Sequence, residues 1–444
     1  MKFLKQHIYI LAGLLLISAC KPEIKIPKST SGGADFSRYI ALGNSLTAGY
    51  ADGGLYLAGQ QNSYPSIMAK QMQSVGGGVF NQPLFSAAQA NGSGYLSLTG
   101  FSSLGSPILT PVTSNLAIRG QINVPGFGNV VLYTKYTGDI ENYGVPGIKL
   151  LNITYAPYGD LNGYYERLLP GDAPTNSTPY LNFVMAKPFT FFSNWLGNND
   201  ALGYATSGGA GDQLTDPNTF ALLYNLLINT LTTKNANGVT PKGVVGTIPD
   251  VTSIPYFNTV TVDAVVAGVQ KLIPQAKGIY INALVSGTTY APRLATSSDL
   301  IVLTFPTSMI GTTVNTPYGQ LPYGLTPYSP IDNQYILDAN EVKLTREHVI
   351  AFNNTIKSVA AAHGLAVFDS YTFLNNVKQY GLLVDGIGLN SDYVSGGIFS
   401  LDGVHLTPRG YAIVANQFID AINVKYGSNI PEADVASYPG VKFP

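Results

Sequence analysis

A serine near the start of the chain and a histidine near its end have the side chains needed to attack a carbonyl carbon. Ser45 follows a short apolar stretch at residues 39–42, which predicts a buried strand that ends at Gly43. Ligands of α/β proteins bind at the carboxyl ends of parallel strands, so Ser45 would lie at the edge where chemistry occurs. Taken alone, the pattern is more typical of an ordinary turn. A serine hydroxyl also needs a base to accept its proton.

Among the four histidines, His405 stands in the most suitable place for that base. His7 belongs to the amino-terminal leader, His348 lies within a predicted helix, and His363 lies at the end of that helix, where it could cap it. His405 precedes the last predicted helix, and Asp402 lies three residues upstream. This spacing lets the Asp402 carboxylate accept a hydrogen bond from one imidazole nitrogen while the other nitrogen faces a serine. By itself, D-x-x-H is more often a polar turn.

Acyl transfer also requires donors for the oxyanion that forms on the carbonyl oxygen. Gly147 ends a turn-rich stretch at residues 142–147, and Asn199 lies in the sequence Gly-Asn-Asn-Asp at 197–200. A backbone N–H at Gly147 and the side-chain amide of Asn199 could both serve as donors. Each residue alone is equally typical of a tight turn.

In their order along the chain, these blocks resemble the SGNH (GDSL-like) hydrolases, a family named for Ser, Gly, Asn and His. The matching blocks are Gly-Asn-Ser-Leu at 43–46, residues 142–147, Gly-Asn-Asn-Asp at 197–200 and Asp-Gly-Val-His at 402–405. The resemblance extends from residue 39 to about residue 424 and is interrupted by insertions. Asn44 departs from it, because the family usually has Asp there. The sequence contains no G-x-S-x-G, which argues against an ordinary α/β-hydrolase.

The resemblance implies hydrolysis of a carboxylic ester through an acyl-serine intermediate, on a three-layer, flavodoxin-like α/β fold. Ser45 would be the nucleophile, His405 the base and then the acid, and Asp402 the residue that orients His405. The N–H groups of Ser45 and Gly147 and the Asn199 amide would form the oxyanion hole. Neither a metal nor an organic cofactor would be needed, and no cluster of His, Asp and Glu in the sequence suggests a metal site.

The substrate class stays open at this stage. The ester could belong to a lipid, a small molecule or an acylated glycan, and the 29 tyrosines would suit either a sugar ring or an acyl groove. One alternative is a deacetylase of O-acetylated polysaccharide. Others are a surface lipoprotein that binds without catalysis and a structural lipoprotein of the outer membrane.

Alternating strands and helices in the rest of the chain predict a parallel sheet with helices on both faces. The predicted strands are 39–43, 186–196, 242–248, 278–285 and 366–368, and the predicted helices are 64–74, 218–233, 261–273, 341–362 and 407–422. Long insertions at about 76–138 and 286–340 read as a few short strands and as ordered coil, respectively. We expect both to build the rim or lid of the site, so that deletion of 306–334 would change acyl-chain preference.

The amino terminus has the features of an export signal. Residues 1–19 combine lysines, an apolar run and small residues, which predicts a signal peptide. Cys20, the single cysteine, follows Ile-Ser-Ala in a setting that resembles a bacterial lipobox, and this implies lipidation. Residues 20–35 would then form a tether, 36–426 the hydrolase domain and 427–444 a carboxyl-terminal tail. Because Lys21 is not the aspartate that retains some lipoproteins at the inner membrane, we expect an anchor in the outer membrane of a Gram-negative cell envelope.

The overall composition fits an exported protein better than a nucleic-acid-binding one. The 444 residues carry a net charge of −1, and 11% of them are charged. The sequence contains no basic patch, so we expect no nucleic-acid partner. Low charge together with many tyrosines favours an exported chain with long, ordered loops.

Overall fold

A computed structural model of the chain describes residues 29–103 and 105–444. The predicted signal peptide, Cys20 and the first part of the predicted tether lie outside the described residues, and their assignments stay predictions.

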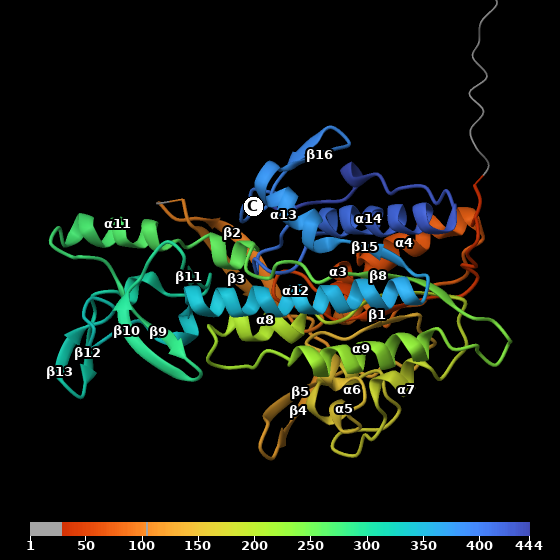
Figure 1. Ribbon diagram of the computed structural model, residues 1–444, viewed down its shortest axis with the longest axis horizontal. Helices are drawn as coiled ribbons and strands as arrows, with labels where there is room; N and C mark the ends of the chain where they lie inside the picture. The colour runs from red at the N-terminus through yellow and green to blue at the C-terminus, as the bar shows by residue number, and fades with distance from the viewer. Residues whose placement is uncertain (1–28, 104) are drawn as a thin grey trace, which may run out of the picture.

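Five parallel strands form the central sheet in the order β15-β8-β7-β1-β6 (Figure 1). Their bounds are β1 Tyr39–Gly43, β6 Asn142–Gly144, β7 Phe191–Trp195, β8 Lys242–Gly246 and β15 Ala366–Phe368. Counted by appearance in the chain, the order is 2-1-3-4-5, which is the flavodoxin-like order. From β1 the chain first adds β6 on one side and then β7, β8 and β15 on the other, so the strand order reverses at β1. Ligands are expected beside the carboxyl end of the strand where such a reversal occurs. The predicted fold class is confirmed.

Helices cover both faces of the sheet (Figure 1). One face carries α4 (Tyr64–Met72) and α14 (Pro408–Tyr426), and the other carries α9 (Pro217–Leu231) and α12 (Ala339–Ala362). Side chains of β7 alternate between the two faces, as they must in a strand. Trp195 lies 5.5 Å from the ring of Phe418 in α14, whereas Asn194 binds Tyr224 in α9. The apolar cores on both faces hold β1 and β7 in place.

Two elements of the sheet differ from the sequence prediction. The predicted strand at 278–285 exists as β9 (Tyr280–Ser286), but it lies outside the central sheet and pairs antiparallel with β10 (Thr289–Leu294). The edge place is taken by β6, whose sequence Asn-Tyr-Gly has no apolar run that could predict a strand. Its extended form depends on pairing with β1, a long-range contact that local sequence does not encode.

The helices largely agree with the prediction. The helix α11 (Val262–Leu272) is present, while α13 (Ser370–Tyr380) was not predicted. Ile350 in α12 is 47% exposed, although it is an apolar residue. The remaining helices are short: α2 Ser45–Ala48, α3 Leu57–Gln61, α5 Tyr158–Leu161, α6 Gly163–Glu166, α7 Tyr180–Val184, α8 Asn199–Thr206 and α10 Pro255–Asn258.

Both insertions contain antiparallel pairs of short strands. The first contains β2 (Tyr95–Phe101) with β3 (Pro107–Val112), and β4 (Ile118–Val124) with β5 (Gly128–Tyr133). The second, expected to be coil, pairs short strands instead: β11 Leu300–Ile301 with β14 Ile336–Leu337, and β12 Thr313–Thr316 with β13 Gly319–Pro322. A further hairpin joins β16 (Leu382–Val384) to β17 (Ile387–Leu389). Glycines with positive φ close several of these turns, which is the property that makes tight hairpins possible.

Both ends of the described chain pack on α14. The Gly33 N–H donates to the carbonyl of Tyr426 at 2.7 Å, and the Asn429 N–H donates to the carbonyl of Thr30. In the segment predicted as a tail, Val435 is fully buried, and the Asn416 side chain binds the backbone of Ala433. Residues 427–444 therefore form part of the folded body.

Candidate active site

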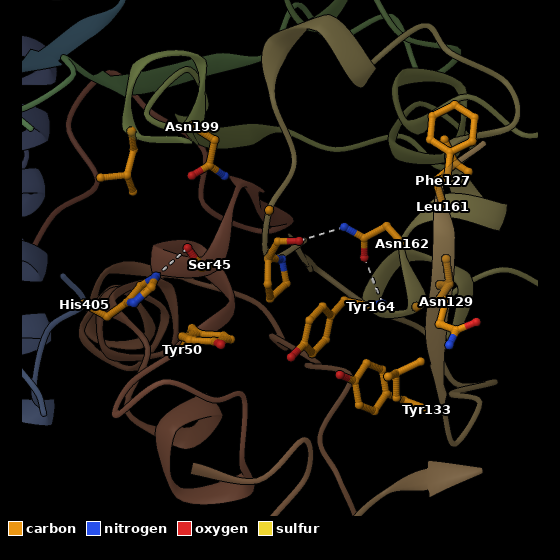
Figure 2. A pocket seen from close by; sticks show the side chains of 16 residues that line it. Ser45, Tyr50, Phe127, Asn129, Tyr133, Leu161, Asn162, Tyr164, Asn199 and His405 are labelled. Carbon is orange, nitrogen blue, oxygen red and sulfur yellow. Dashed lines mark hydrogen bonds between the residues drawn. The ribbon is translucent and has the colours of Figure 1, made fainter. Parts of the chain in front are cut away.

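The structure brings Ser45, His405 and Asp402 into one hydrogen-bonded chain. The Oγ of Ser45 lies 2.8 Å from Nε2 of His405, and Nδ1 of His405 lies 2.8 Å from Oδ2 of Asp402. Figure 2 shows the imidazole directed at the serine hydroxyl, which lies at the carboxyl end of β1. The arrangement has the geometry of a serine nucleophile, a general base and an orienting carboxylate.

Local sequence fixes the direction of Ser45. Asn44 caps α2, because its side-chain oxygen accepts a hydrogen bond from the Leu46 N–H at 3.0 Å. An amide oxygen accepts this bond as a carboxylate would, so Asn serves at this cap position as well as Asp. A Cβ at Gly43 would lie 1.9 Å from the hydroxyl of Thr47. The turn from strand to helix therefore needs glycine at position 43.

Asp402 is surrounded by donors that favour its charged form. The N–H groups of Val404 and His405 donate to Oδ1, and the Gly53 N–H donates to Oδ2 at 2.9 Å. Burial, the largest single influence, raises the pKa of Asp402, but the charge of His405 and these hydrogen bonds outweigh it. The net result is a pKa held well below the usual range of a carboxyl. Asp402 can thus orient His405 and stabilise its protonated form.

A turn after the nucleophile helix holds the loop of Asp402 in place. Asp52, in the left-handed region with φ of 54°, accepts a hydrogen bond from the Leu401 N–H at 2.9 Å, and its own N–H donates to Ser400 Oγ. The ring of Tyr50 lies 4.5 Å from the His405 ring. The sequence analysis missed these contacts, although an Asp-Gly pair soon after the nucleophile is a recognisable turn signal.

The two residues predicted to bind the oxyanion also border the site. Gly147, with φ of 83°, lines the same cavity as Ser45, and no described residue accepts a hydrogen bond from its N–H. Asn199 begins α8, and its amide donates one hydrogen to the carbonyl of Ile148 at 2.9 Å. An amide nitrogen has two hydrogens, so the second stays available for a ligand. The donors needed for an oxyanion hole are thus gathered beside Ser45.

Asp200 ties the Gly147 loop to α8. One oxygen of its carboxylate accepts a hydrogen bond from the Leu150 N–H at 2.7 Å, and the other accepts one from the Thr215 hydroxyl at 2.6 Å. Burial raises the pKa of Asp200 to about 6. Asp200 follows Asn199 directly, so the first turn of α8 carries the Asn199 amide and also binds the loop after Gly147.

Two cavities border His405, and one of them also contains Ser45. The first, here called the tyrosine cavity, has a volume of about 580 Å³ and contains Ser45, Gly147 and Asn199, with aromatic walls that Figure 2 shows. Its walls are formed by Tyr50, Phe127, Asn129, Val130, Val131, Tyr133, Pro146, Leu161, Asn162, Gly163, Tyr164, Leu202 and His405.

The second, here called the leucine cavity, has a volume of about 750 Å³ and reaches Asp402 and His405. Its walls are formed by Tyr50, Gly53, Leu96, Ser106, Pro107, Leu109, Leu202, Thr206, Tyr256, Thr259, Val260, Leu303, Thr304, Tyr393, Leu401 and Val404. The ring of Tyr50 separates it from the tyrosine cavity and borders both.

The insertions contribute unequally to these walls. The hairpin β4–β5 supplies one side of the tyrosine cavity, and the hairpin β2–β3 supplies one side of the leucine cavity. From the second insertion, Leu303 and Thr304 reach the leucine cavity, and no described residue of 306–334 lines either one. The expectation that 306–334 forms a rim or lid is therefore wrong. These residues pair with each other at β12 and β13, at the far end of the molecule (Figure 1).

Within residues 29–103 and 105–444, no three side chains of His, Cys, Asp or Glu are grouped so that they could hold a metal ion. No helix in this part of the chain is long and apolar enough to cross a membrane.

Comparison with known proteins gives weak likenesses. No family model and no curated protein matches the chain. Three solved structures are similar in outline. An α/β hydrolase from the metagenome of Lake Arreo, Spain, has a TM-score of 0.36 and 11% identity, over 88% of this chain and 96% of that one. The lipase/acylhydrolase from Enterococcus faecalis has a TM-score of 0.33 and 12% identity, over 89% and 100%.

The third is a mutant acetyl-xylooligosaccharide esterase from Geobacillus, with a TM-score of 0.35 and 10% identity, over 88% of this chain and 96% of that one. At these TM-scores the likenesses carry no argument about activity. The assignment of the fold class follows from the chain's own strand order.

We predict that Ser45 reacts selectively with an organophosphonate that labels activated serines. Ser45→Ala should give no adduct, and Asp402→Asn should slow labelling by about a thousandfold or more, because the amide cannot orient and charge-stabilise His405. Intact-protein and peptide mass spectrometry would measure the rate and the position. Asp263→Asn, an exposed substitution on α11, is the matched control and should label at the original rate. Equal labelling of the Asp402 and Asp263 variants would contradict a role for Asp402.

Proposed function

We propose that the chain is a serine ester hydrolase that cleaves a carboxylic ester through an acyl-serine intermediate. The observation that carries this proposal is the continuous hydrogen-bonded chain from Ser45 through His405 to Asp402, placed beside two open cavities. The same arrangement can act on any ester whose carbonyl carbon reaches Ser45 Oγ. Its resemblance to the SGNH pattern supports the same reaction class.

In the first half of the proposed reaction, Ser45 Oγ attacks the carbonyl carbon while His405 Nε2 takes the serine proton. The carbonyl oxygen becomes negative and is held by the N–H groups of Ser45 and Gly147 and by the Asn199 amide. A single donor of this kind typically lowers the barrier by about 3–4 kcal/mol. His405 then gives its proton to the departing alcohol, which leaves an acyl group on Ser45.

In the second half, water replaces the alcohol. His405 takes a proton from water, the resulting hydroxide attacks the acyl carbon, and the proton returns to Ser45 Oγ as the acid departs. Asp402 keeps the imidazole in one tautomer throughout, since its carboxylate accepts from Nδ1. The chain's own residues supply every proton transfer in this sequence.

Two alternatives remain distinguishable by experiment. A deacetylase of O-acetylated polysaccharide would use the same residues, and its sugar could stack on Tyr133 or Tyr164, whose rings lie 4.5 Å apart. A lipoprotein that binds without catalysis is less well supported, because such a protein has no need for a serine, a histidine and a carboxylate in hydrogen-bonding order.

We also propose that lipidation of Cys20 anchors the protein in the cell envelope, in the outer membrane. Lys242, the first residue of β8, binds the carbonyl of Gly33, so the described chain begins at the amino edge of the sheet. Ser45 lies at the carboxyl edge.

Replacement of Cys20 tests this anchor. We expect Cys20→Ala to move the protein from the membrane fraction to the soluble fraction and to abolish incorporation of a labelled fatty acid. Cys20 is the single cysteine of the sequence, so the variant has no thiol that could be acylated in its place. Fractionation of expressing cells, with Ser74→Ala as a control that keeps the cysteine, would measure it. Unchanged fractionation of Cys20→Ala would refute lipidation as the anchor.

For the hydrolase itself, we predict cleavage of p-nitrophenyl esters by the purified protein and loss of at least about a thousandfold in kcat/KM in Ser45→Ala. Absorbance of released p-nitrophenol, over acyl chains from acetate to palmitate, would measure the rate and the chain-length preference. Ser74→Ala, which changes an exposed serine on the surface, is the matched control. Cleavage of acetylated xylan without cleavage of any p-nitrophenyl ester would favour the deacetylase instead. Equal rates for the Ser45 and Ser74 variants would exclude Ser45 as the nucleophile.

A further inference from the structure

The leucine cavity lies on the leaving-group side of the proposed nucleophile. In acyl transfer, the general base returns its proton to the departing oxygen, so the alcohol part of an ester must lie next to the imidazole. The leucine cavity is bordered by His405, Asp402 and Val404, but not by Ser45, Gly147 or Asn199. The tyrosine cavity contains Ser45 and both predicted oxyanion residues, and His405 borders this cavity as well.

This division assigns the two parts of an ester to separate spaces. When the carbonyl oxygen points to Gly147 and Asn199 and the leaving oxygen points to His405, the acyl chain is left to extend into the tyrosine cavity. A long alcohol part that passes His405 would then enter the leucine cavity, which borders the imidazole but not Ser45. Tyr50, which borders both, would lie against the ester group between them.

The walls of the leucine cavity combine aliphatic side chains with uncharged hydroxyl-bearing ones, and they come from distant parts of the chain. Leu96 and Leu109 belong to the hairpin β2–β3, Val260 follows α10, and Leu303 belongs to the second insertion. All four side chains are half-buried around the opening. The lining contains no Lys or Arg, and its one carboxylate, Asp402, is already bound to His405. Such a wall favours an uncharged, apolar group over a phosphate or other anion.

Hydrogen bonds fix these walls to the catalytic loops. The Tyr256 N–H donates to the carbonyl of Gly403 at 2.9 Å, and the Leu303 N–H donates to the carbonyl of Tyr256 at 2.7 Å. Gly403, with φ of 70°, has no Cβ, and a Cβ there would lie 2.9 Å from Leu303.

On the nucleophile side, the Leu96 N–H donates to the carbonyl of Asp52 at 2.7 Å. The leucine cavity is thus attached to both loops that carry the site, which means that it exists before a ligand binds.

We propose that the leucine cavity binds an uncharged, apolar alcohol part, so that the substrates are neutral lipid esters with a long alkyl chain on the alcohol side. This inference rests on the proposed function, since it specifies the substrate of the same site. A volume of about 750 Å³ falls within the range of cavities that enclose ligands of drug-like size. The alkyl chain could belong to a fatty alcohol or to a diglyceride, and the two share the chemistry that the cavity recognises.

A pair of isomeric esters separates the two cavities. Octyl acetate carries its long chain on the alcohol and ethyl octanoate carries it on the acid, although the two have the same atoms and a similar hydrophobicity. We expect the purified full-length protein to hydrolyse octyl acetate with the higher kcat/KM. Leu303→Asp and Leu109→Asp, from two different wall elements, should each lower kcat/KM for octyl acetate by about tenfold or more. Neither substitution should lower kcat/KM for ethyl octanoate to a comparable extent, because an ethyl group is too short to fill the leucine cavity.

Two further variants control the experiment. Leu161→Asp, in the tyrosine cavity, should lower kcat/KM for ethyl octanoate more than kcat/KM for octyl acetate. Leu383→Asp changes a leucine that is 77% exposed on β16 and should affect neither ester. A thermal unfolding transition in each variant serves as the control for folding. Because two wall positions are substituted separately, the test stays valid if one of the two variants does not fold. Release of acetate from 1-acetyl-2,3-dioctanoylglycerol, compared with octyl acetate, distinguishes a glyceride from a fatty alcohol as the source of the chain.

The outcomes separate this inference from the proposed function. Equal losses for both isomers in the Leu303 and Leu109 variants, or a larger loss for ethyl octanoate, would overturn the assignment of the leucine cavity. Cleavage of p-nitrophenyl acetate without cleavage of octyl acetate or the acetyl glyceride would also overturn it, while the serine ester hydrolase would stand. Failure to cleave any ester would overturn the proposed function, and this inference with it.

Discussion

The contact between Ser45 and His405 joins residues that are 360 positions apart, and the rest of the structure is arranged so that it can form. Neither residue reaches the other through local structure. Ser45 is placed by β1, which lies between β6 and β7 in the sheet, and His405 is placed by the start of α14, which packs on the same sheet. A parallel sheet meets this demand because the carboxyl ends of all its strands lie at one edge.

The loops at that edge are held to each other as well as to the sheet. The Gly53 N–H and the Asp52 carboxylate connect the nucleophile loop to the loop of Asp402, and Asp200 connects α8 to the loop after Gly147. Each connection consists of a buried or half-buried carboxylate that accepts backbone N–H groups. Fixed geometry of this kind matters for catalysis, because oxyanion donors are effective when they are positioned before the reaction begins.

Residues with a local signature could be predicted from the sequence. The strand before Ser45, the D-x-x-H spacing and the helix from Pro408 each depend on neighbouring residues, so a short window contains the information. The strand β6 could not be predicted, because three residues without an apolar run become a strand only beside β1. For the same reason, the strand at 280–286 was recognised but its exclusion from the sheet was not, since local pattern does not identify a strand's partner.

The walls of the cavities also depend on long-range contacts and could not be predicted from the sequence. Leu96, Tyr256 and Leu303 are unremarkable in the sequence. Backbone hydrogen bonds to distant segments hold them in place, from Leu96 to Asp52 and from Leu303 to Tyr256. Position in the sequence was also misleading for residues 306–334, which belong to an insertion beside the site but pair with each other instead. The candidate residues of the site could therefore be proposed from the sequence, whereas the shape of the cavities beside them could not.

Ser45 is proposed to carry the acyl group during turnover, and rapid-quench mass spectrometry during hydrolysis of p-nitrophenyl acetate tests this step most directly. We predict an acetyl group on the peptide that contains Ser45, formed with the release of p-nitrophenol and lost as acetate appears. Hydrolysis without any acyl-protein, or with the acetyl group on a residue other than Ser45, would contradict it.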